Sequence, residues 1–327
     1  MITKRIIILL TIFIWFMMFT AGIPFFVKSK TMCKCFKHQT IILLYYLLHR
    51  DFDASIFYKG SNLETIPGKV NIIVLNHIST VDWLIFYSFM AKKYSINNVH
   101  QILKDDLLWY PCIGEVCSSN NDIFVKRDWK SDESTIDKLL QKIDSGFIMI
   151  FPEGTRFTKK KLESSKLYAK DNNFVDLDNL LLPKSKGTWK IINSLMKDNK
   201  LGNFYDITCI STRYRRTEMY MKEIFCDGIG DVYLDIKKVI YPDKSILIDK
   251  SEFKLWLHSI WKQKDILMDN FAKDGYNKLD SPYETDLIFH VVLSLIILLI
   301  VKKFGWKYLL ANFGLTYIKL ICTKLFS

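Results

Sequence analysis

Residues 70–83, with the sequence VNIIVLNHISTVDW, carry the strongest structural pattern of the chain. The stretch begins with an apolar run of strand length and passes through Asn76 and His77 to Asp82. A continuous apolar run of this length is typical of a strand buried on both faces of a sheet. We therefore predict a buried strand that ends at His77, followed by a helix with Asp82 in its first turn.

Other segments extend this pattern into a fold. Strand-length apolar runs occur at residues 99–103, 122–125, 147–151, 207–210 and 232–236. Apolar residues recur at helical spacing in residues 131–144, 188–197 and 252–270, with Ser131 as a plausible N-cap. Strands that alternate with helices predict an α/β fold with a mixed, largely buried sheet flanked by helices. Residues 159–178 are polar and predict a mobile loop.

The composition indicates a globular domain attached to a membrane. The chain has 327 residues, 50% of them hydrophobic, and a formal net charge of +12. This charge favours an anionic partner such as a phospholipid surface or a phosphorylated substrate. Nucleic acid is not expected, because no recognisable binding module interleaves aromatic and basic residues. The seven cysteines have no zinc-type spacing, which predicts reduced thiols in the cytosol and no metal site.

Apolar runs at both ends predict membrane segments. Residues 6–27 are nearly all apolar, and about 20 such residues span a bilayer as a helix. An uncleaved anchor is favoured over a cleaved signal peptide, because the run is long and no convincing cleavage site follows. Lysines after the run place the downstream side in the cytosol. Residues 40–49 predict an interfacial helix or, equally, an ordinary core helix. Residues 287–301 and 306–322 predict a membrane hairpin, or one span and an interfacial helix.

These patterns divide the chain into three parts. Residues 1–57 are the predicted membrane anchor and interfacial helix, residues 58–275 the catalytic domain, and residues 285–322 the C-terminal membrane segment or segments. The division rests on the change in composition after the apolar N-terminal runs.

His77 and Asp82 form a candidate proton-transfer pair. A lone histidine is more often a satisfied core residue, but His77 follows a predicted buried strand, where α/β sheets place their active crevice. Asp82 can hold the Nδ1–H group of the imidazole and leave Nε2 free to accept a proton. No serine or cysteine at convincing spacing can act as a nucleophile. We therefore expect the substrate's own hydroxyl to attack an already activated group such as a thioester.

Three later stretches supply candidate anion-binding residues. FPEGTRF, residues 151–157, offers a glycine for a tight turn and Arg156 for a phosphate, with Glu153 to orient the arginine or bind a hydroxyl. IFVKR ends in Lys126 and Arg127, and LLPKSKG contains Lys184. FPEGTRF taken alone is equally consistent with a strand-ending turn that carries a surface salt bridge. The basic residues of the other two stretches, taken alone, are more often simply exposed to solvent, but together with Arg156 they could form an anion site.

The order NHISTVDW, IFVKR, FPEGTRF and LLPKSKG resembles the four sequence blocks of the glycerophospholipid acyltransferase family, which includes 1-acylglycerol-3-phosphate acyltransferases. The resemblance covers roughly residues 69–187. Weaker similarity, including the helix with Trp256 and Trp261, is to the lysocardiolipin and lysophosphatidylinositol acyltransferase branch. Gly114-Glu115 and Thr188 depart from the family pattern, but neither affects the His–Asp pair.

The resemblance implies a role for each matching residue. His77 would be the general base and Asp82 would orient it. The implied substrate-binding residues are Asn76, Lys126, Arg127, Glu153, Gly154, Thr155, Arg156, Pro183 and Lys184.

The implied activity is transfer of a fatty acyl chain from acyl-CoA to a lysophospholipid hydroxyl at a membrane, with no metal or bound cofactor. The family also implies the endoplasmic reticulum, with the catalytic domain facing the cytosol. A CoA-independent phospholipid transacylase and a non-catalytic lipid-binding protein remain as alternatives.

Overall fold

The computed structural model describes most of the predicted catalytic domain. The described residues are 54–94, 98–109, 120–214 and 227–280, with Ile41, Ile42, Tyr45, His49, Gly114, Cys117, Ser118, Met219, Tyr220, Glu223 and Ile224. The predicted membrane segments at residues 6–27, 287–301 and 306–322 lie outside these residues. No helix within the described part combines the length and the apolarity needed to cross a bilayer.

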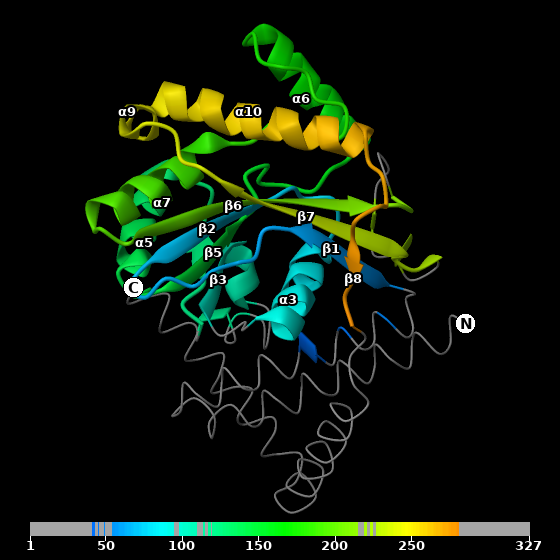
Figure 1. The fold of residues 1–327 in the computed structure, drawn as a ribbon. Coiled ribbons are helices and arrows are strands. Elements are labelled where there is room, and N and C mark those ends of the chain that lie inside the picture. The colour runs from blue at the N-terminus through cyan, green and yellow to red at the C-terminus, as the bar shows by residue number, and fades with distance from the viewer. Residues whose placement is uncertain are drawn as a thin grey trace, which may run out of the picture.

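An eight-stranded mixed sheet forms the centre of the domain (Figure 1). Its strands are β1 (Ser55–Gly60), β2 (Val70–Leu75), β3 (Val99–Lys104), β4 (Ile123–Val125), β5 (Gly146–Ile150), β6 (Leu201–Ser211), β7 (Asp231–Val239) and β8 (Asn277–Lys278). They lie in the order β4-β3-β5-β2-β6-β7-β1-β8. The first five are parallel neighbours, whereas β7 is antiparallel to β6 and β8 is antiparallel to β1. The carboxyl ends of β4, β3, β5 and β2 therefore share one edge.

Helices cover both faces of this sheet (Figure 1). One face packs on α3 (Asp82–Lys93), and alternate residues of β2 such as Ile73 and Leu75 point into that core. The other face packs on α5 (Trp129–Leu140), α7 (Ser185–Lys197), α9 (Lys244–Ile248) and α10 (Lys250–Asp269). Every residue of β2 is buried, as expected for a strand covered on both sides.

The predicted α/β fold is confirmed, and six of the eight strands follow the predicted runs. The strands β1 and β8 were not predicted, and β6 extends well beyond residues 207–210. Ser131 is not the N-cap of α5. That helix begins at Trp129 after an extended Asp128, and the Ser131 hydroxyl donates to the Asp128 carbonyl instead.

The prediction of a mobile loop over residues 159–178 is wrong for residues 159–171. Residues Lys159–Asp171 form α6, which projects beyond α10 away from the sheet (Figure 1). Its N-cap is Thr158, whose hydroxyl accepts from the Lys161 amide. Only Ala169 of this helix is buried, so it lacks the apolar stripe by which a packed helix is recognised.

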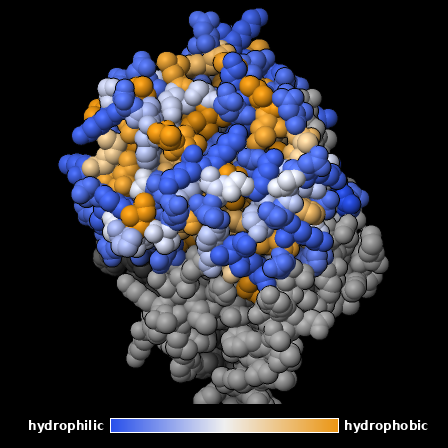
Figure 2. All heavy atoms as spheres, in the orientation of Figure 1, coloured by the Kyte–Doolittle hydropathy of each residue, from blue (hydrophilic) through white to orange (hydrophobic). Residues whose placement is uncertain are grey.

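The surface around α6 and α10 is mixed in character. Hydrophilic residues cover much of the face in Figure 2, with smaller hydrophobic groups among them. The exposed large hydrophobic side chains of α6 and α10 are Leu167, Tyr168, Leu255 and Ile266. Ile248, on the preceding α9, is also exposed. Such scattered apolar residues are normal on a protein surface.

The described residues of the segment 40–49 belong to a helix packed on the core. Ile41, Ile42 and Tyr45 are buried among side chains of the α3 face. The Tyr45 hydroxyl donates to the Asp280 carbonyl, 3.3 Å away, and His49 Nδ1 lies 3.0 Å from the Ala54 carbonyl. At these positions the core-helix alternative describes the structure.

Candidate active site

His77 and Asp82 form a hydrogen-bonded pair at the carboxyl end of β2. His77 Nδ1 lies 2.8 Å from Asp82 Oδ2. The carboxylate is fully buried and is the first residue of α3, whereas the imidazole is 22% exposed. Asp82 also accepts from the Ser79 amide at 2.8 Å and from the Ser79 hydroxyl at 2.5 Å. Because an ionised carboxylate only accepts hydrogen bonds, Nδ1 carries the hydrogen and Nε2 is left as the acceptor.

The segment after β5 holds the main chain and the ring of His77. The His77 amide donates to Glu153 Oε1 at 3.3 Å, and the His77 carbonyl accepts from the Phe157 amide at 2.8 Å. The Phe151 ring lies 4.6 Å from the imidazole, centroid to centroid. The first and third sequence blocks therefore form one structural unit, as the parallel pairing of β2 with β5 requires.

Glu153 is buried behind this unit. Its Oε1 accepts from the Trp261 indole at 3.3 Å as well as from the His77 amide, and Oε2 has no hydrogen-bond partner among the described residues. Burial raises the pKa of Glu153 to about 8, although the hydrogen bonds from Trp261 and His77 and the charge of Lys264 lower it. The side chain thus bonds the protein's own main chain and does not orient Arg156. Its predicted contact with a substrate hydroxyl stays a prediction.

The turn at Gly154 brings the third and fourth blocks together. Gly154 has a φ of 67°, in the left-handed region that glycine tolerates best. A Cβ built on it would lie 3.5 Å from Lys184 Cδ and 3.7 Å from Lys184 Nζ. The Lys184 amide donates to the Pro152 carbonyl at 2.7 Å. Pro183 is buried, and its carbonyl lies 3.3 Å from His258 Nε2. Lys184 therefore borders the same turn as Arg156.

The residues after the turn are fixed by a lysine that the sequence did not single out as a site residue. Lys161 Nζ donates to Thr155 Oγ1 at 2.6 Å and to the Arg156 carbonyl at 3.2 Å. Arg156 itself is half-buried, and its guanidinium makes no ion pair with the described residues. The only sequence signal for Lys161 is its place shortly after FPEGTRF in the basic run 159–161.

Asn76 links β2 to β6. Its side-chain amide donates to the Cys209 carbonyl at 2.9 Å and accepts from the Cys209 amide at 2.7 Å. The side chain is completely buried. These bonds give Asn76 a positioning role next to His77, and its predicted substrate contact stays a prediction.

Lys126 and Arg127 share the edge but lie apart from the His–Asp pair. They follow β4, which is separated from β5 by β3 and from β2 by β3 and β5. Both side chains are exposed, and Arg127 has a φ of 65°. Neighbouring strands lie about 4.8 Å apart, so the main chain at these residues is roughly 10 Å from that of β5.

Side chains of α10 contact residues of the site, and sequence analysis did not predict these contacts. His258 contacts the Pro183 carbonyl, and Trp261 contacts Glu153. Lys264 is fully buried, donates to the Ile207 carbonyl at 2.6 Å and forms an ion pair with Asp206. The apolar spacing of residues 252–270 predicted a packed helix, but no local pattern pairs a polar residue with a partner so distant in sequence.

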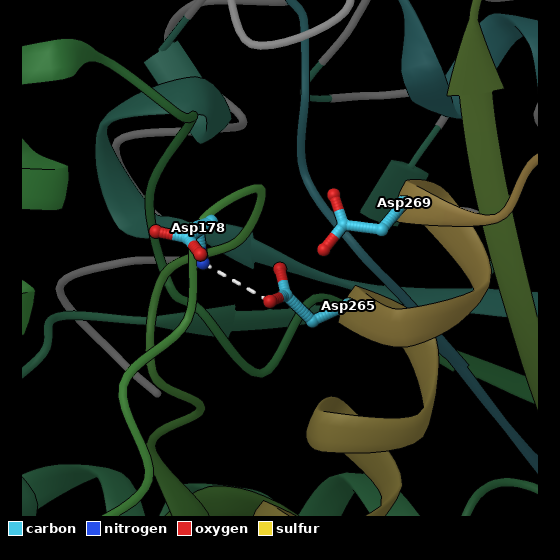
Figure 3. Close-up of side chains that lie close together, drawn as sticks. All are labelled: Asp178, Asp265 and Asp269. Atoms are coloured by element: carbon cyan, nitrogen blue, oxygen red, sulfur yellow. Dashed lines mark hydrogen bonds between the residues drawn. The ribbon is translucent and has the colours of Figure 1, made fainter.

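Among the described residues, one group of three carboxylates has a geometry that could accommodate a metal ion. Two of them lie in the last turns of α10, and the third lies in the segment before the fourth block. Asp178, Asp265 and Asp269 offer ligand atoms within 4.8 Å of one another (Figure 3). Asp265 instead accepts from the amides of Asp178 and Asn179 at 3.0 and 2.7 Å, and the Asp178 carboxylate pairs with Lys166. The cluster thus joins the segment before the fourth block to α10 by ordinary hydrogen bonds. Cys117 and Cys209 are both buried, and Cys117 Sγ accepts from Gln101 Nε2 at 3.6 Å.

The chain is similar in sequence to known acyltransferases. Residues 58–211 match the family model described as Acyltransferase. A probable 1-acyl-sn-glycerol-3-phosphate acyltransferase 5 of Arabidopsis thaliana is 24% identical, covering 77% of this chain and 66% of that protein. The epsilon form of 1-acyl-sn-glycerol-3-phosphate acyltransferase from Mus musculus is 30% identical, covering 62% of this chain and 58% of that protein. Lysocardiolipin acyltransferase 1 of Mus musculus is 26% identical, covering 71% of this chain and 61% of that protein.

The chain therefore spans about two thirds or less of the length of these curated relatives. A crystal structure of the 1-acyl-sn-glycerophosphate acyltransferase PlsC from Thermotoga maritima aligns with a TM-score of 0.48 at 17% identity. It covers 84% of this chain and 100% of that one. The match over residues 58–211, which contains His77, Asp82 and the FPEGTRF turn, shows that this part of the chain is an acyltransferase domain.

Proposed function

We propose that this protein transfers a fatty acyl chain from acyl-CoA to the hydroxyl of a lysophospholipid, either lysophosphatidic acid or a related 1-acylglycerophospholipid, in phospholipid synthesis or remodelling. The observation that carries the proposal is the His77–Asp82 pair, 2.8 Å apart, at the edge where the Gly154 turn presents Arg156. The names of the relatives support an acceptor of this class.

The geometry supports a general-base mechanism. Nε2 of His77 takes the proton of the acceptor hydroxyl while the hydroxyl oxygen attacks the thioester carbonyl carbon. The buried Asp82 carboxylate stabilises the imidazolium that forms. When the tetrahedral intermediate collapses, the C–S bond breaks and the imidazolium returns its proton to the CoA sulfur. The products are the ester and free CoA, and His77 is again neutral.

The acceptor phosphate has two candidate cations beside the turn. Arg156 offers a planar fork that fits a phosphate with two parallel hydrogen bonds, and Lys184 adds a point charge. Lys126 and Arg127 lie farther along the edge, where they suit a more distant anionic group of either substrate. No resident cofactor enters this mechanism, because acyl-CoA is a substrate.

The experiment uses the purified full chain in phospholipid-detergent micelles. Acceptors are lysophosphatidic acid, lysophosphatidylinositol and lysocardiolipin, and donors are several acyl-CoAs or intact phospholipids without CoA, with products measured by mass spectrometry. Acyl-CoA-dependent product supports the proposal. Product from intact phospholipids alone would replace it with a transacylase, and lipid binding without product from any pair would indicate a non-catalytic protein.

We further propose that the protein acts at the endoplasmic reticulum membrane, with residues 58–275 facing the cytosol. The support is the net charge of +12 and the apolar runs at both ends of the sequence. In sealed microsomes, protease added from outside is expected to digest residues 58–275. Complete protection of that region would contradict this orientation.

A further inference from the structure

The position of His77 depends on contacts outside the sheet. The residue lies just after β2, where strand pairing has ended. Its main chain is held by Phe157, which donates to its carbonyl, and by Glu153, which accepts from its amide. Of these two contacts, the one to Glu153 involves a side chain, which must itself be held in place.

Trp261 is the residue that holds Glu153. The indole Nε1–H donates to the same Oε1 atom that accepts from His77. Glu153 is 2% exposed, and its other oxygen has no hydrogen-bond partner among the described residues. The indole is thus the side-chain donor that fixes the orientation of the carboxyl group. Trp261 is itself completely buried in the core between α10 and the sheet.

The neighbouring turn of α10 is attached to β6. Lys264 Nζ lies 5.1 Å from the centre of the Trp261 ring, donates to the Ile207 carbonyl at 2.6 Å and pairs with Asp206. Two residues along the same strand, Cys209 binds the side chain of Asn76.

These contacts form a closed ring. It runs from His77 through Glu153 to Trp261 and α10, from α10 through Lys264 to β6, and from β6 through Asn76 back to His77. The hydrogen bonds made by Trp261, Lys264 and Asn76 are buried, the bond between His77 and Glu153 is partly buried, and a peptide bond joins Asn76 to His77.

We propose that Trp261 is a positioning residue that acts through Glu153 to set the main-chain position of His77 and thereby the location of its Nε2 atom. The inference rests on the proposed function, because it assumes that Nε2 accepts the substrate proton. A misplacement of about 1 Å in a reacting group costs on the order of 10²-fold in rate. The effect should therefore appear in kcat, whereas substrate affinity depends on other residues.

The test compares Trp261→Phe with Trp256→Phe in the full chain. Trp256 is on the same helix and packs on Phe204, Tyr241 and Phe253, with no contact to Glu153. We expect Trp261→Phe to lower kcat at least tenfold with KM for both substrates within about twofold, and Trp256→Phe to leave kcat within about twofold. Equal kcat values for the two variants, or a change confined to KM, would overturn the inference.

A second pair of variants avoids the cavity that Trp261→Phe creates. Glu153→Gln keeps an oxygen that accepts from both His77 and Trp261, whereas Glu153→Met has similar length and no acceptor. Glu153→Met should have a kcat at least fivefold below that of Glu153→Gln, and equal values would contradict the inference. His77→Ala is measured in parallel. If it stays active, the proposed function fails, whereas an inactive His77→Ala with equal tryptophan variants rejects only the role of Trp261.

Discussion

Asp82 accepts three hydrogen bonds from two residues, and this number matters for the chemistry of His77. The donors are the His77 ring, the Ser79 amide and the Ser79 hydroxyl. A carboxylate has the acceptor sites for all of them and no donor of its own. It therefore fixes one tautomer of the imidazole, with the hydrogen on Nδ1.

The substitution Asp82→Asn tests this arrangement. The amide carries no negative charge and has one acceptor oxygen in place of two, so it stabilises the imidazolium that forms on His77 less than the carboxylate does. We expect kcat for acyl transfer to fall about 10² to 10⁴-fold, the range that a positioned general base contributes. Ser79→Ala serves as the graded control, because it removes one donor and should cost less than tenfold. Asp82→Asn with kcat within threefold of wild type would contradict the assignment.

In the proposed mechanism, recognition of the acceptor phosphate depends most on Arg156. Arg156→Lys keeps the charge but loses the planar fork. We expect the KM for the lysophospholipid to rise roughly tenfold, equivalent to about 1.4 kcal/mol, with kcat little changed. Lys170→Ala, which removes a cation from the far end of α6, should leave this KM within twofold. An unchanged KM in Arg156→Lys would place the phosphate elsewhere.

At the scale of elements, the turn at Gly154 connects β5 to α6 and is followed by Arg156, the proposed phosphate-binding residue. Its backbone lies in the left-handed region, whereas the space around it would admit a Cβ at ordinary contact distances from Lys184. The requirement for glycine is therefore conformational, not steric.

Gly154→Ala should lower the free energy of unfolding by about 1–2 kcal/mol, the cost of a left-handed backbone at a residue with a side chain. Gly187→Ala is the matched control, because Gly187 lies within α7 with open space around it and no positive φ. That variant should gain about 0.5–1 kcal/mol. Urea denaturation measures both, and equal effects of the two substitutions would refute the explanation.

Elements were predictable from sequence where they are buried. The runs that became β2 and β5 are covered on both faces, so each of their residues is apolar or tightly enclosed. Strand β1 buries only Ile56 and α6 buries only Ala169, so neither shows a strong period of buried apolar residues. The formation of such elements depends on tertiary contacts and, for α6, on its N-cap Thr158. A local pattern of apolar residues shows neither of these.

On the scale of the whole molecule, the site joins parts of the chain that lie far apart in sequence. The pairing of His77 with Asp82 and their proximity to the Gly154 turn follow from strand ends, and were predictable. The contacts of Trp261 with Glu153 and of Lys264 with β6 were not, because they depend on how α10 crosses the sheet. The motif residues were therefore foreseeable, whereas most of the residues that hold them were not.

The buried Glu153 carboxyl makes the stability of the folded protein depend on pH. Its pKa is 4.5 in a model peptide and is raised to about 8 in the folded protein, chiefly by burial. Between these values the folded state binds more protons than the unfolded chain, so this group's contribution to stability is present at low pH and is lost as the pH rises toward about 8.

Glu153→Gln should remove this dependence. Urea denaturation at about pH 5 and about pH 8 is expected to show a larger loss of stability for wild type than for the variant. Glu163→Gln, on the exposed face of α6, should behave as wild type. A variant that loses as much stability as wild type over this range would show that Glu153 does not titrate there.

The central claim is that His77 accepts the proton of a lysophospholipid hydroxyl during attack on an acyl-CoA. The most direct measurement is single-turnover acyl transfer by the purified full chain, comparing wild type with His77→Ala and His77→Gln at saturating acyl-CoA and lysophosphatidic acid. We predict rates about 10² to 10⁴-fold lower in both variants, with unchanged folding by circular dichroism. Rates within threefold of wild type would contradict the claim.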